Sequence, residues 1–252
     1  MIKKSVLTLF ALVVFWIAEA NFNTSNGSVR HAEPDNVQVP VNSLYQELKA
    51  NAKSLPAEEV FTIALQGFTN LKTISNTVKK QILTIIDFSL PSTKKRLWVI
   101  DLKNRKVLFH DLVAHGKNSG SLYARKFSNI QSTYMSSLGF YLTGNTYQGK
   151  HGLSLVLKGM DKDFNDKARE RAIVMHGADY VGNDFIRKYG RLGRSFGCPA
   201  LSTAISRQVI ETIRDGSCLF IYYPDKEFLA KSQVLNRTRQ LFSGLQQRPT
   251  GY

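Results

Sequence analysis

The stretch from Gly190 to Ser202, GRLGRSFGCPALS, contains the residue types that nucleophilic catalysis requires. Cys198 lies in this glycine-rich turn, and a cysteine attacks a carbonyl carbon as its thiolate. Arg191 and Arg194 precede it and add positive charge, which favours the thiolate and attracts a substrate carboxylate. Gly197 allows backbone N–H groups to turn toward the oxygen of a reacting carbonyl. The turn therefore points to a cysteine nucleophile, although the same pattern also fits a purely structural turn.

A nucleophile of this kind needs a base, and three of the five histidines are followed by glycine. His176 ends the apolar segment AIVMHG and lies 22 residues before Cys198, which leaves room for one short helix between them. The carbonyl of Gly177 can accept the Nδ1 proton and hold Nε2 toward the sulfur, the orienting role that a carboxylate has in other triads. The other two, His115 and His151, are expected either to line the cleft or to be ordinary residues at strand ends.

The second cysteine, Cys218, has a different setting. It lies in CLFIYY, a run typical of a buried strand, where a free cysteine packs as a small hydrophobic residue. We therefore expect an inert core thiol there. The alternative is a disulfide between Cys198 and Cys218, because exported proteins often pair their cysteines, and such a bridge would remove the nucleophile.

The elements that must position these residues are mostly short strands. Runs rich in β-branched and aromatic residues predict strands at 82–90, 96–102, 107–116, 139–144, 152–159, 172–177 and 218–223. Helices are expected at 42–53, from Pro56 onward, at 183–190 and at 202–215. Strands and helices do not alternate regularly, which disfavours a doubly wound parallel sheet. The pattern predicts an α+β, β-rich chain: a mixed-sheet sandwich or partial barrel with peripheral helices and an N-terminal helical pair.

The N-terminus has the three parts of a secretory signal peptide: lysines at 3 and 4, an apolar run at 6–17, and Ala-Glu-Ala at 18–20. The apolar run is shorter than the roughly 20 residues of a membrane-spanning helix, so an uncleaved anchor is the less favoured alternative. The expected organisation is a signal peptide at 1–20, a flexible linker at 21–41, a helical segment at 42–80, a catalytic domain at 81–225 and a basic C-terminal tail at 226–252.

The formal net charge is +15 at pH 7, and it falls to +14 when two lysines and one glutamate leave with the signal peptide. Such a charge favours anionic cell-envelope polymers as partners. Nucleic acid is disfavoured, because export is expected and no nucleic-acid-binding motif is found. A non-enzymatic, basic wall-binding protein remains an alternative, although it leaves the cysteine turn unexplained. No histidine pair has the spacing of a zinc motif such as HExxH, so neither a metal nor another cofactor is expected.

The segment at 174–202, VMHGADYVGNDFIRKYGRLGRSFGCPALS, resembles the active-site segment of the L,D-transpeptidases of the YkuD type. The family pattern is His-Gly and, after a loop, Ser-His-Gly-Cys followed by Arg or Asn. The sequence matches this pattern at HG (176–177) and at S-x-GC (195–198). It departs at Phe196, where histidine is common, and at PA (199–200), where arginine is usual. These departures resemble a divergent branch, the murein L,D-transpeptidase catalytic domains with the GRSxGCPA motif. Weaker similarity extends over residues 83–223.

The resemblance implies that Cys198 is the nucleophile and His176 its base. It also implies that the Gly177 carbonyl orients the base and that Gly197 and Ser195 belong to the oxyanion-binding turn. The implied reaction transfers a peptidoglycan stem peptide, through a thioester, to an amine of a second stem, which gives a 3–3 cross-link. With water as acceptor, the same site is an L,D-carboxypeptidase. Carbapenem-type inhibitors are implied partners, and the periplasm or cell wall of a bacterium is the implied location. Substrate contacts are expected from Arg194, His115, His151, Tyr123 and Tyr141.

Overall fold

The computed structural model describes residues 41–75 and 77–236. The expected signal peptide lies outside the described residues, as does the expected linker apart from residue 41, which begins the first helix. Within the described ranges, no helix is both long enough and apolar enough to cross a membrane.

A single mixed sheet of eight strands forms the centre of the fold, which confirms the predicted α+β class. The strand order is β3-β2-β1-β8-β4-β5-β6-β7. β8 pairs parallel with β1, and β7 pairs parallel with β6, whereas the other neighbours are antiparallel. The strands are β1 (Ile82–Asp87), β2 (Leu97–Asp101), β3 (Lys106–Asp111), β4 (Gly139–Gly149), β5 (Gly152–Gly159), β6 (Val174–Ala178), β7 (Ala200–Ser202) and β8 (Cys218–Tyr222).

The two edges of this sheet meet through the segment that follows β3. Ala114 forms an isolated antiparallel bridge with Ala200 of β7, and Gly116 forms a parallel bridge with Ser195. Since β3 and β7 are the outermost strands, these bridges require the sheet to curl into a partial barrel. Register shifts in the β2–β3 and β4–β5 pairs add local bends. The curl brings the sequence around Ser195 next to a segment that precedes it by about eighty residues.

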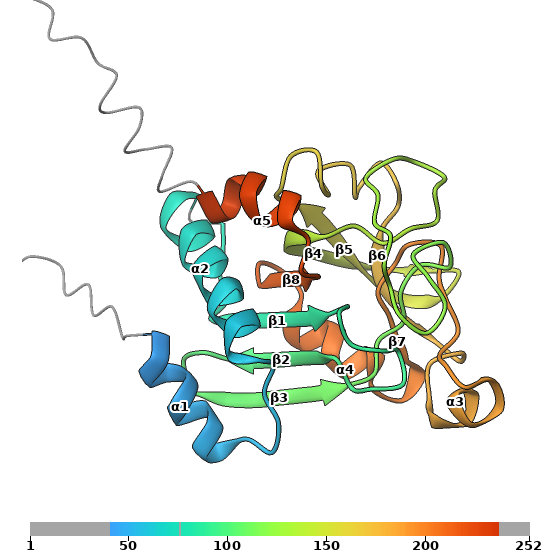
Figure 1. Cartoon of the computed structure of the whole chain (residues 1–252), viewed down its shortest axis with the longest axis horizontal. Helices are drawn as coiled ribbons and strands as arrows, with labels where there is room; N and C mark the ends of the chain where they lie inside the picture. The colour runs from blue at the N-terminus through green and yellow to red at the C-terminus, as the bar shows by residue number, and fades with distance from the viewer. Residues whose placement is uncertain (1–40, 76, 237–252) are drawn as a thin grey trace, which may run out of the picture. The chain divides into compact units, whose positions relative to one another are not determined.

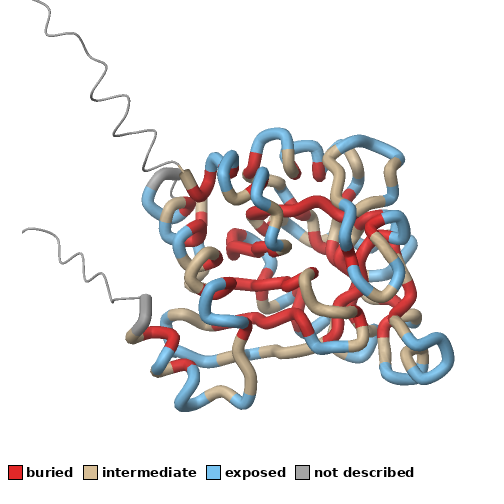
Figure 2. Tube along the Cα trace, viewed as in Figure 1, coloured by how far each residue is buried: buried red, intermediate tan, exposed pale blue. Residues whose placement is uncertain are grey.

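Helices pack on the sheet at two places (Figure 1). α1 (Val41–Asn51) and α2 (Glu58–Ser75) form the expected helical pair, and α2 packs against β1 and β8. α4 (Thr203–Ile213) packs against β5, β6 and β7 with Val209, Ile210 and Ile213 buried. α3 (Asn183–Tyr189) buries none of its residues, and Figure 2 shows it in the colours of exposed and intermediate residues. The sheet is therefore covered by helices that precede its first strand and by a helix that precedes its last strand.

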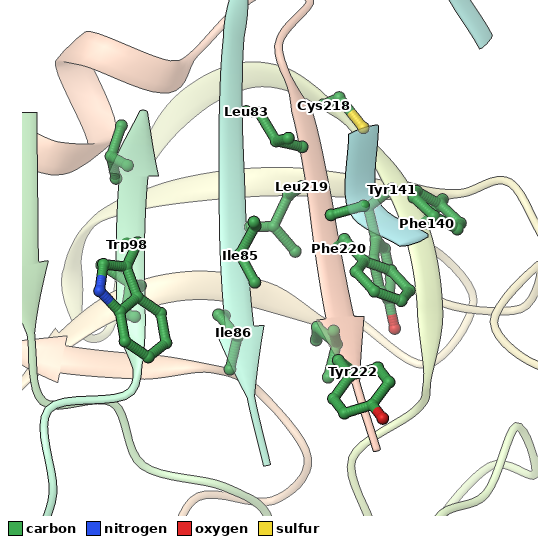
Figure 3. Close-up of a cluster of buried hydrophobic side chains, with 14 of the residues drawn as sticks. Leu83, Ile85, Ile86, Trp98, Phe140, Tyr141, Cys218, Leu219, Phe220 and Tyr222 are labelled. Atoms are coloured by element: carbon green, nitrogen blue, oxygen red, sulfur yellow. The ribbon is translucent and has the colours of Figure 1, made fainter. Parts of the chain in front are cut away.

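Strands β1 and β8 lie within the core: every residue of β8 and all but the first residue of β1 are buried. Figure 3 shows Leu83 and Ile85 of β1 beside Leu219 and Phe220 of β8, with Cys218 in the same cluster. Cys218 is fully buried and free, and burial raises the pKa of its thiol. This is the environment of an unreactive core thiol.

The packed part of the chain continues beyond residue 225, where the sequence suggests a basic tail. Phe228 of α5 (Lys226–Lys231) is fully buried, and Val234 is nearly so. The buried carboxylate of Asp161 also accepts a hydrogen bond of 2.6 Å from Ser232 Oγ. Residues 226–236 therefore belong to the folded unit, because the buried side chains of Phe228 and Val234 and two buried hydrogen bonds to the Asp161 carboxylate attach them to it.

Candidate active site

Strands β6 and β7 bring the two reactive residues of the sequence motif together. The strands run parallel, with His176 of β6 opposite Ala200 of β7, and Cys198 lies two residues before Ala200. The side chains of Cys198 and His176 line one pocket of about 490 Å³. The other walls come from the β4–β5 hairpin, the segment that enters β6, and the turn before β7.

The Cys198 sulfur is held by the segment that enters β6. Its Sγ accepts a hydrogen bond of 3.5 Å from the backbone N–H of Val174 and lies 3.8 Å from the carbonyl oxygen of Ala172. Burial raises the pKa of the thiol above its ordinary value, and the Val174 N–H and the charge of Arg171 oppose this only in part. The resting side chain is therefore a thiol that points its hydrogen toward Ala172.

The ring of His176 is buried and fixed on two sides. Its Nδ1 lies 2.8 Å from the Gly177 carbonyl oxygen, which can only accept, so Nδ1 carries the proton and Nε2 is the basic nitrogen. The exposed ring of His151 stacks on it with centroids 4.4 Å apart. Burial lowers the pKa of His176, the Gly177 bond opposes this, and His151 and Lys150 lower it further. At pH 7 the pocket therefore holds a neutral imidazole beside a neutral thiol.

The turn that carries Cys198 is closed by Ser195. Ser195 Oγ donates to the carbonyl oxygen of Cys198 at 2.6 Å and accepts from the N–H of Gly197 at 3.1 Å. Gly197 has φ 127°, and a Cβ there would lie 2.8 Å from the Met135 carbonyl oxygen. Because the Gly197 N–H is used inside the turn, the N–H group beside the sulfur is that of Cys198 itself.

The pocket is positively charged. Lys150, Arg171 and Arg194 line it, and none of its described lining residues is acidic. Arg194 Nη1 donates to the carbonyl oxygens of Gly120 at 3.1 Å and of Lys117 at 3.3 Å, which fixes the guanidinium at the wall. A pocket of this composition favours an anionic ligand.

Several pocket residues were missed by sequence reasoning, among them Lys150, Arg171 and Tyr180. Arg171 donates to the carbonyl oxygens of Ser128 at 2.6 Å and Met135 at 2.7 Å, and so clamps a distant loop beside the thiol. It belongs to the charged run NDKARER, which has the composition of a solvated surface segment. Tyr180 packs over Gly193, where a Cβ would lie 2.4 Å from the tyrosine Cβ, and burial raises the pKa of Tyr180 to about 12. Gly193 is the one signal in the nearby sequence that a large side chain, here Tyr180, packs against the backbone at this point.

Three of the expected substrate-contact residues lie outside the pocket. His115 is fully buried, and its Nδ1 accepts a hydrogen bond of 2.8 Å from Arg96. Tyr141 is also fully buried, and its hydroxyl donates to the carbonyl oxygen of Ser137 at 3.1 Å. Tyr123 is partly exposed but does not line the pocket. Alternation along a strand separates its two faces, but it does not show which face a curled sheet turns toward the site.

A family model described as the L,D-transpeptidase catalytic domain matches residues 52–222. The match ends with the last residue of β8 and includes α2, which a boundary at residue 81 leaves out. A search of curated protein sequences found no match.

Solved structures give distant matches. The chain is 13% identical to an L,D-transpeptidase from Mycobacterium smegmatis, with a TM-score of 0.36, and the match covers 57% of this chain and 59% of that one. The helical cell shape determining protein Pgp2 from Campylobacter jejuni is 14% identical, with a TM-score of 0.38 and coverage of 71% and 65%. For Mycobacterium tuberculosis L,D-transpeptidase 1 the identity is 12%, the TM-score 0.32 and the coverage 56% and 60%. The chain thus spans less than two thirds of the length of each.

Proposed function

The chain belongs to the L,D-transpeptidase catalytic domain family, and we propose that it is an exported enzyme that acts on peptidoglycan stem peptides through a thioester on Cys198. The observation that carries this proposal is the pocket shared by Cys198 and His176, which combines a free thiol with a buried imidazole whose Nε2 is basic. Export rests on the signal-peptide pattern of residues 1–20. The net charge of +15 supports contact with anionic polymers of the cell envelope.

The reaction starts from the neutral pair. As Sγ of Cys198 attacks the carbonyl carbon of the stem peptide, Nε2 of His176 accepts the thiol proton. The tetrahedral intermediate then collapses with cleavage of the C–N bond, and the imidazolium gives this proton to the leaving amine of the terminal D-alanine. The acyl group remains on sulfur as a thioester. An amine of a second stem attacks the thioester, and its proton passes through His176 to the departing thiolate, which completes a 3–3 cross-link.

Two backbone groups support the charges that develop in these steps. The Gly177 carbonyl oxygen, 2.8 Å from Nδ1, stabilises the imidazolium and keeps Nε2 as the nitrogen that exchanges protons. The N–H of Cys198 lies beside its own sulfur, where the oxyanion of the intermediate forms. A neutral resting pair suits this chemistry, because the proton moves only when the substrate carbonyl is attacked.

The charge of the pocket fits the proposed substrate. Stem peptides carry free carboxylates, and Lys150, Arg171 and Arg194 line the pocket without an acidic neighbour among its described residues. Both Nη atoms of Arg171 already donate to backbone carbonyl oxygens, whereas Arg194 donates through Nη1 alone, so Lys150 and Nη2 of Arg194 are the groups available to a stem carboxylate. This arrangement favours an anionic acyl donor over a neutral or basic peptide.

Digestion of purified muropeptides by the mature protein tests the proposal. We expect dimers with 3–3 cross-links from the wild-type protein and none from Cys198→Ala. A tripeptide product without dimers would identify water as the acceptor and the enzyme as an L,D-carboxypeptidase. Full turnover by Cys198→Ala would contradict the assignment of the nucleophile.

Acylation by a carbapenem gives an independent test. We expect one adduct per chain, located on the peptide that contains Cys198 by mass spectrometry. Cys218→Ala is the matched control, because this second thiol is fully buried in the core and its replacement should leave the adduct unchanged. Loss of the adduct in Cys218→Ala, in protein that remains folded, would argue against Cys198 as the acylated residue.

A further inference from the structure

Arg96, which precedes β2, is fully buried and does not line the pocket. Its Nε and Nη2 donate to the Val113 carbonyl oxygen at 3.1 and 2.9 Å, and its Nη1 donates to that of Leu90 at 2.7 Å. Its Nη2 also donates to Nδ1 of His115 at 2.8 Å. Burial lowers the pKa of Arg96 to about 9, with the charge of Asp87 opposing this, so the guanidinium is charged at pH 7. A buried charge whose direct partners are all neutral is costly, which calls for an explanation of what it does.

His115 connects this arginine to the wall of the active site. Because an arginine can only donate, Nδ1 of His115 is an acceptor, and Nε2 carries the hydrogen that it donates to the Gly120 carbonyl oxygen at 3.3 Å. The same oxygen accepts the 3.1 Å hydrogen bond from Arg194 of the pocket. Burial and the neighbouring charge of Arg96 lower the pKa of His115 to about 3. The ring is therefore a neutral bridge that accepts on one side and donates on the other.

The backbone at His115 holds the turn that carries Cys198. The N–H of Ser195 donates to the His115 carbonyl oxygen at 3.0 Å, and the N–H of Lys117 donates back to the Ser195 carbonyl oxygen at 2.8 Å. Ser195 Oγ in turn donates to the carbonyl oxygen of Cys198 at 2.6 Å. Two hydrogen bonds, both made by Ser195, thus connect His115, which binds Arg96, to Cys198.

A second connection runs through the next residue, Gly116. Its N–H donates to Ser136 Oγ at 3.0 Å, and this hydroxyl donates to the Gly197 carbonyl oxygen at 3.1 Å. A Cβ on Gly116 would lie 3.0 Å from the Cα of Gly197, so the two segments are in close contact. Residues 114–117 therefore fix the turn both at Ser195 and at Gly197, on the N-terminal side of the thiol.

We propose that Arg96 and His115 are positioning residues: through the backbone of residues 114–117 they hold the Cys198 turn and the Arg194 guanidinium in the geometry that the reaction needs. This inference rests on Cys198 being the nucleophile of the proposed function. In this role His115 touches no substrate and transfers no proton. The role requires that the side chain at position 115 has one hydrogen-bond acceptor facing Arg96 and one donor facing the Gly120 carbonyl oxygen.

These requirements can be tested by comparing His115→Gln with His115→Leu in the full mature chain. A glutamine side chain offers one acceptor oxygen and one donor nitrogen, whereas leucine offers neither and leaves the Arg96 N–H without its partner. The measurement is the alkylation rate of Cys198 by iodoacetamide across pH, with the adduct located by mass spectrometry. This readout requires no transpeptidase turnover, so it separates failure of the inference from failure of the proposed function. Muropeptide turnover and thermal unfolding are measured alongside.

We expect His115→Leu to turn over muropeptides at least about tenfold more slowly, because misplacing a reacting group by about 1 Å can cost on the order of 100-fold, and to alkylate Cys198 with a pH midpoint shifted from that of the wild type. His115→Gln should stay within about threefold of the wild-type rates. Equal losses in both variants would overturn the inference in favour of a direct chemical role for His115. Wild-type rates in folded His115→Leu would also overturn it.

Arg96→Lys provides the measurement if His115→Leu does not fold. Lysine keeps a positive charge, but it cannot grip the Val113 carbonyl and His115 at the same time with a planar fork. We expect slower muropeptide turnover and a shifted pH midpoint for Cys198 alkylation in this variant, with folding retained. An unchanged rate and midpoint in Arg96→Lys would overturn the inference.

Discussion

Ser195→Ala removes one hydroxyl and thereby breaks both hydrogen bonds that close the Cys198 turn. The Cys198 carbonyl oxygen loses a donor at 2.6 Å, and the Gly197 N–H loses an acceptor at 3.1 Å. The backbone bonds of Ser195 to His115 and Lys117 do not involve the hydroxyl and remain. The change therefore loosens the inner part of the turn while its attachment to the rest of the fold stays in place.

The size of the effect follows from the burial of Ser195. Only 6% of this residue is exposed, so water replaces the lost hydroxyl poorly. Leaving a buried backbone group without a partner costs about 1 to 3 kcal/mol. With about 2 kcal/mol for the turn as a whole, the population of its native geometry falls by up to about 30-fold relative to looser forms. We expect the free energy of unfolding to fall by about 2 kcal/mol and carbapenem acylation of Cys198 to slow by up to about 30-fold.

The assay follows acylation by intact mass and stability by urea unfolding. Ser217→Ala is the matched control, because Ser217 is fully buried and its Oγ donates to the Ile213 carbonyl oxygen at 2.7 Å, outside the pocket. We expect this control to lose similar stability and to keep the wild-type acylation rate. The reasoning is refuted if Ser195→Ala acylates at the wild-type rate, or if both variants slow equally.

Three further outcomes follow from the site. Since burial raises the pKa of Cys198, its alkylation rate should keep increasing with pH through 9.0, the ordinary thiol value, whereas a rate already constant at pH 6 would indicate a preformed thiolate. Since burial lowers the pKa of His176, the base stays neutral below pH 6.5, and turnover measured against pH should fall only under that value; a loss above it would contradict the neutral base. Gly197→Ala places a side chain on a residue with φ 127°. We therefore expect the free energy of unfolding, measured by thermal unfolding, to fall by about 1 to 3 kcal/mol, and carbapenem acylation of Cys198 to slow. Gly182→Ala, where a Cβ meets nothing within 4 Å, should behave as wild type, and equal behaviour of the two glycine variants would contradict the strain argument.

Local sequence signals predict seven of the eight strands and four of the five helices in the described part of the chain, but not β7, α5 or the closure of the sheet. The β-branched runs locate the strands, and the glycine-flanked Cys198 and the His176-Gly177 pair mark residues that the structure brings into one pocket. Nothing in the sequence shows that Ala114 meets Ala200, because that pairing depends on the accumulated curl of all the strands between them. The family resemblance does predict that the His176 and Cys198 motifs meet, because they are neighbours in the fold that it implies.

The residues that sequence reasoning misplaced share a physical cause. His115 is one of the glycine-preceding histidines, but its ring turns inward to Arg96 rather than into the pocket. Arg171 has the composition of a surface residue, yet its guanidinium binds carbonyl oxygens of a loop more than thirty residues earlier in the sequence. Phe228 follows what resembles the last core strand and is itself fully buried. In each case the role of the residue depends on a tertiary contact with a residue elsewhere in the chain, and local sequence patterns do not predict such contacts.

The bridge between Ala114 and Ala200 places the proposed nucleophile at the seam of a rolled-up sheet. Residues 114–117 and 195–200 come from opposite edges, so closing the seam joins segments about eighty residues apart in the sequence. Contacts of such long sequence separation slow folding, because the entropy of closing the loop is lost before they form. Neighbouring strands, β6 and β7, hold His176 and the Cys198 turn together, but the hydrogen bonds that fix this turn at Ser195 and Gly197 cross the seam and are absent until the sheet closes. The rate at which Cys198 becomes reactive toward acylation during refolding can therefore report when the seam of the sheet closes.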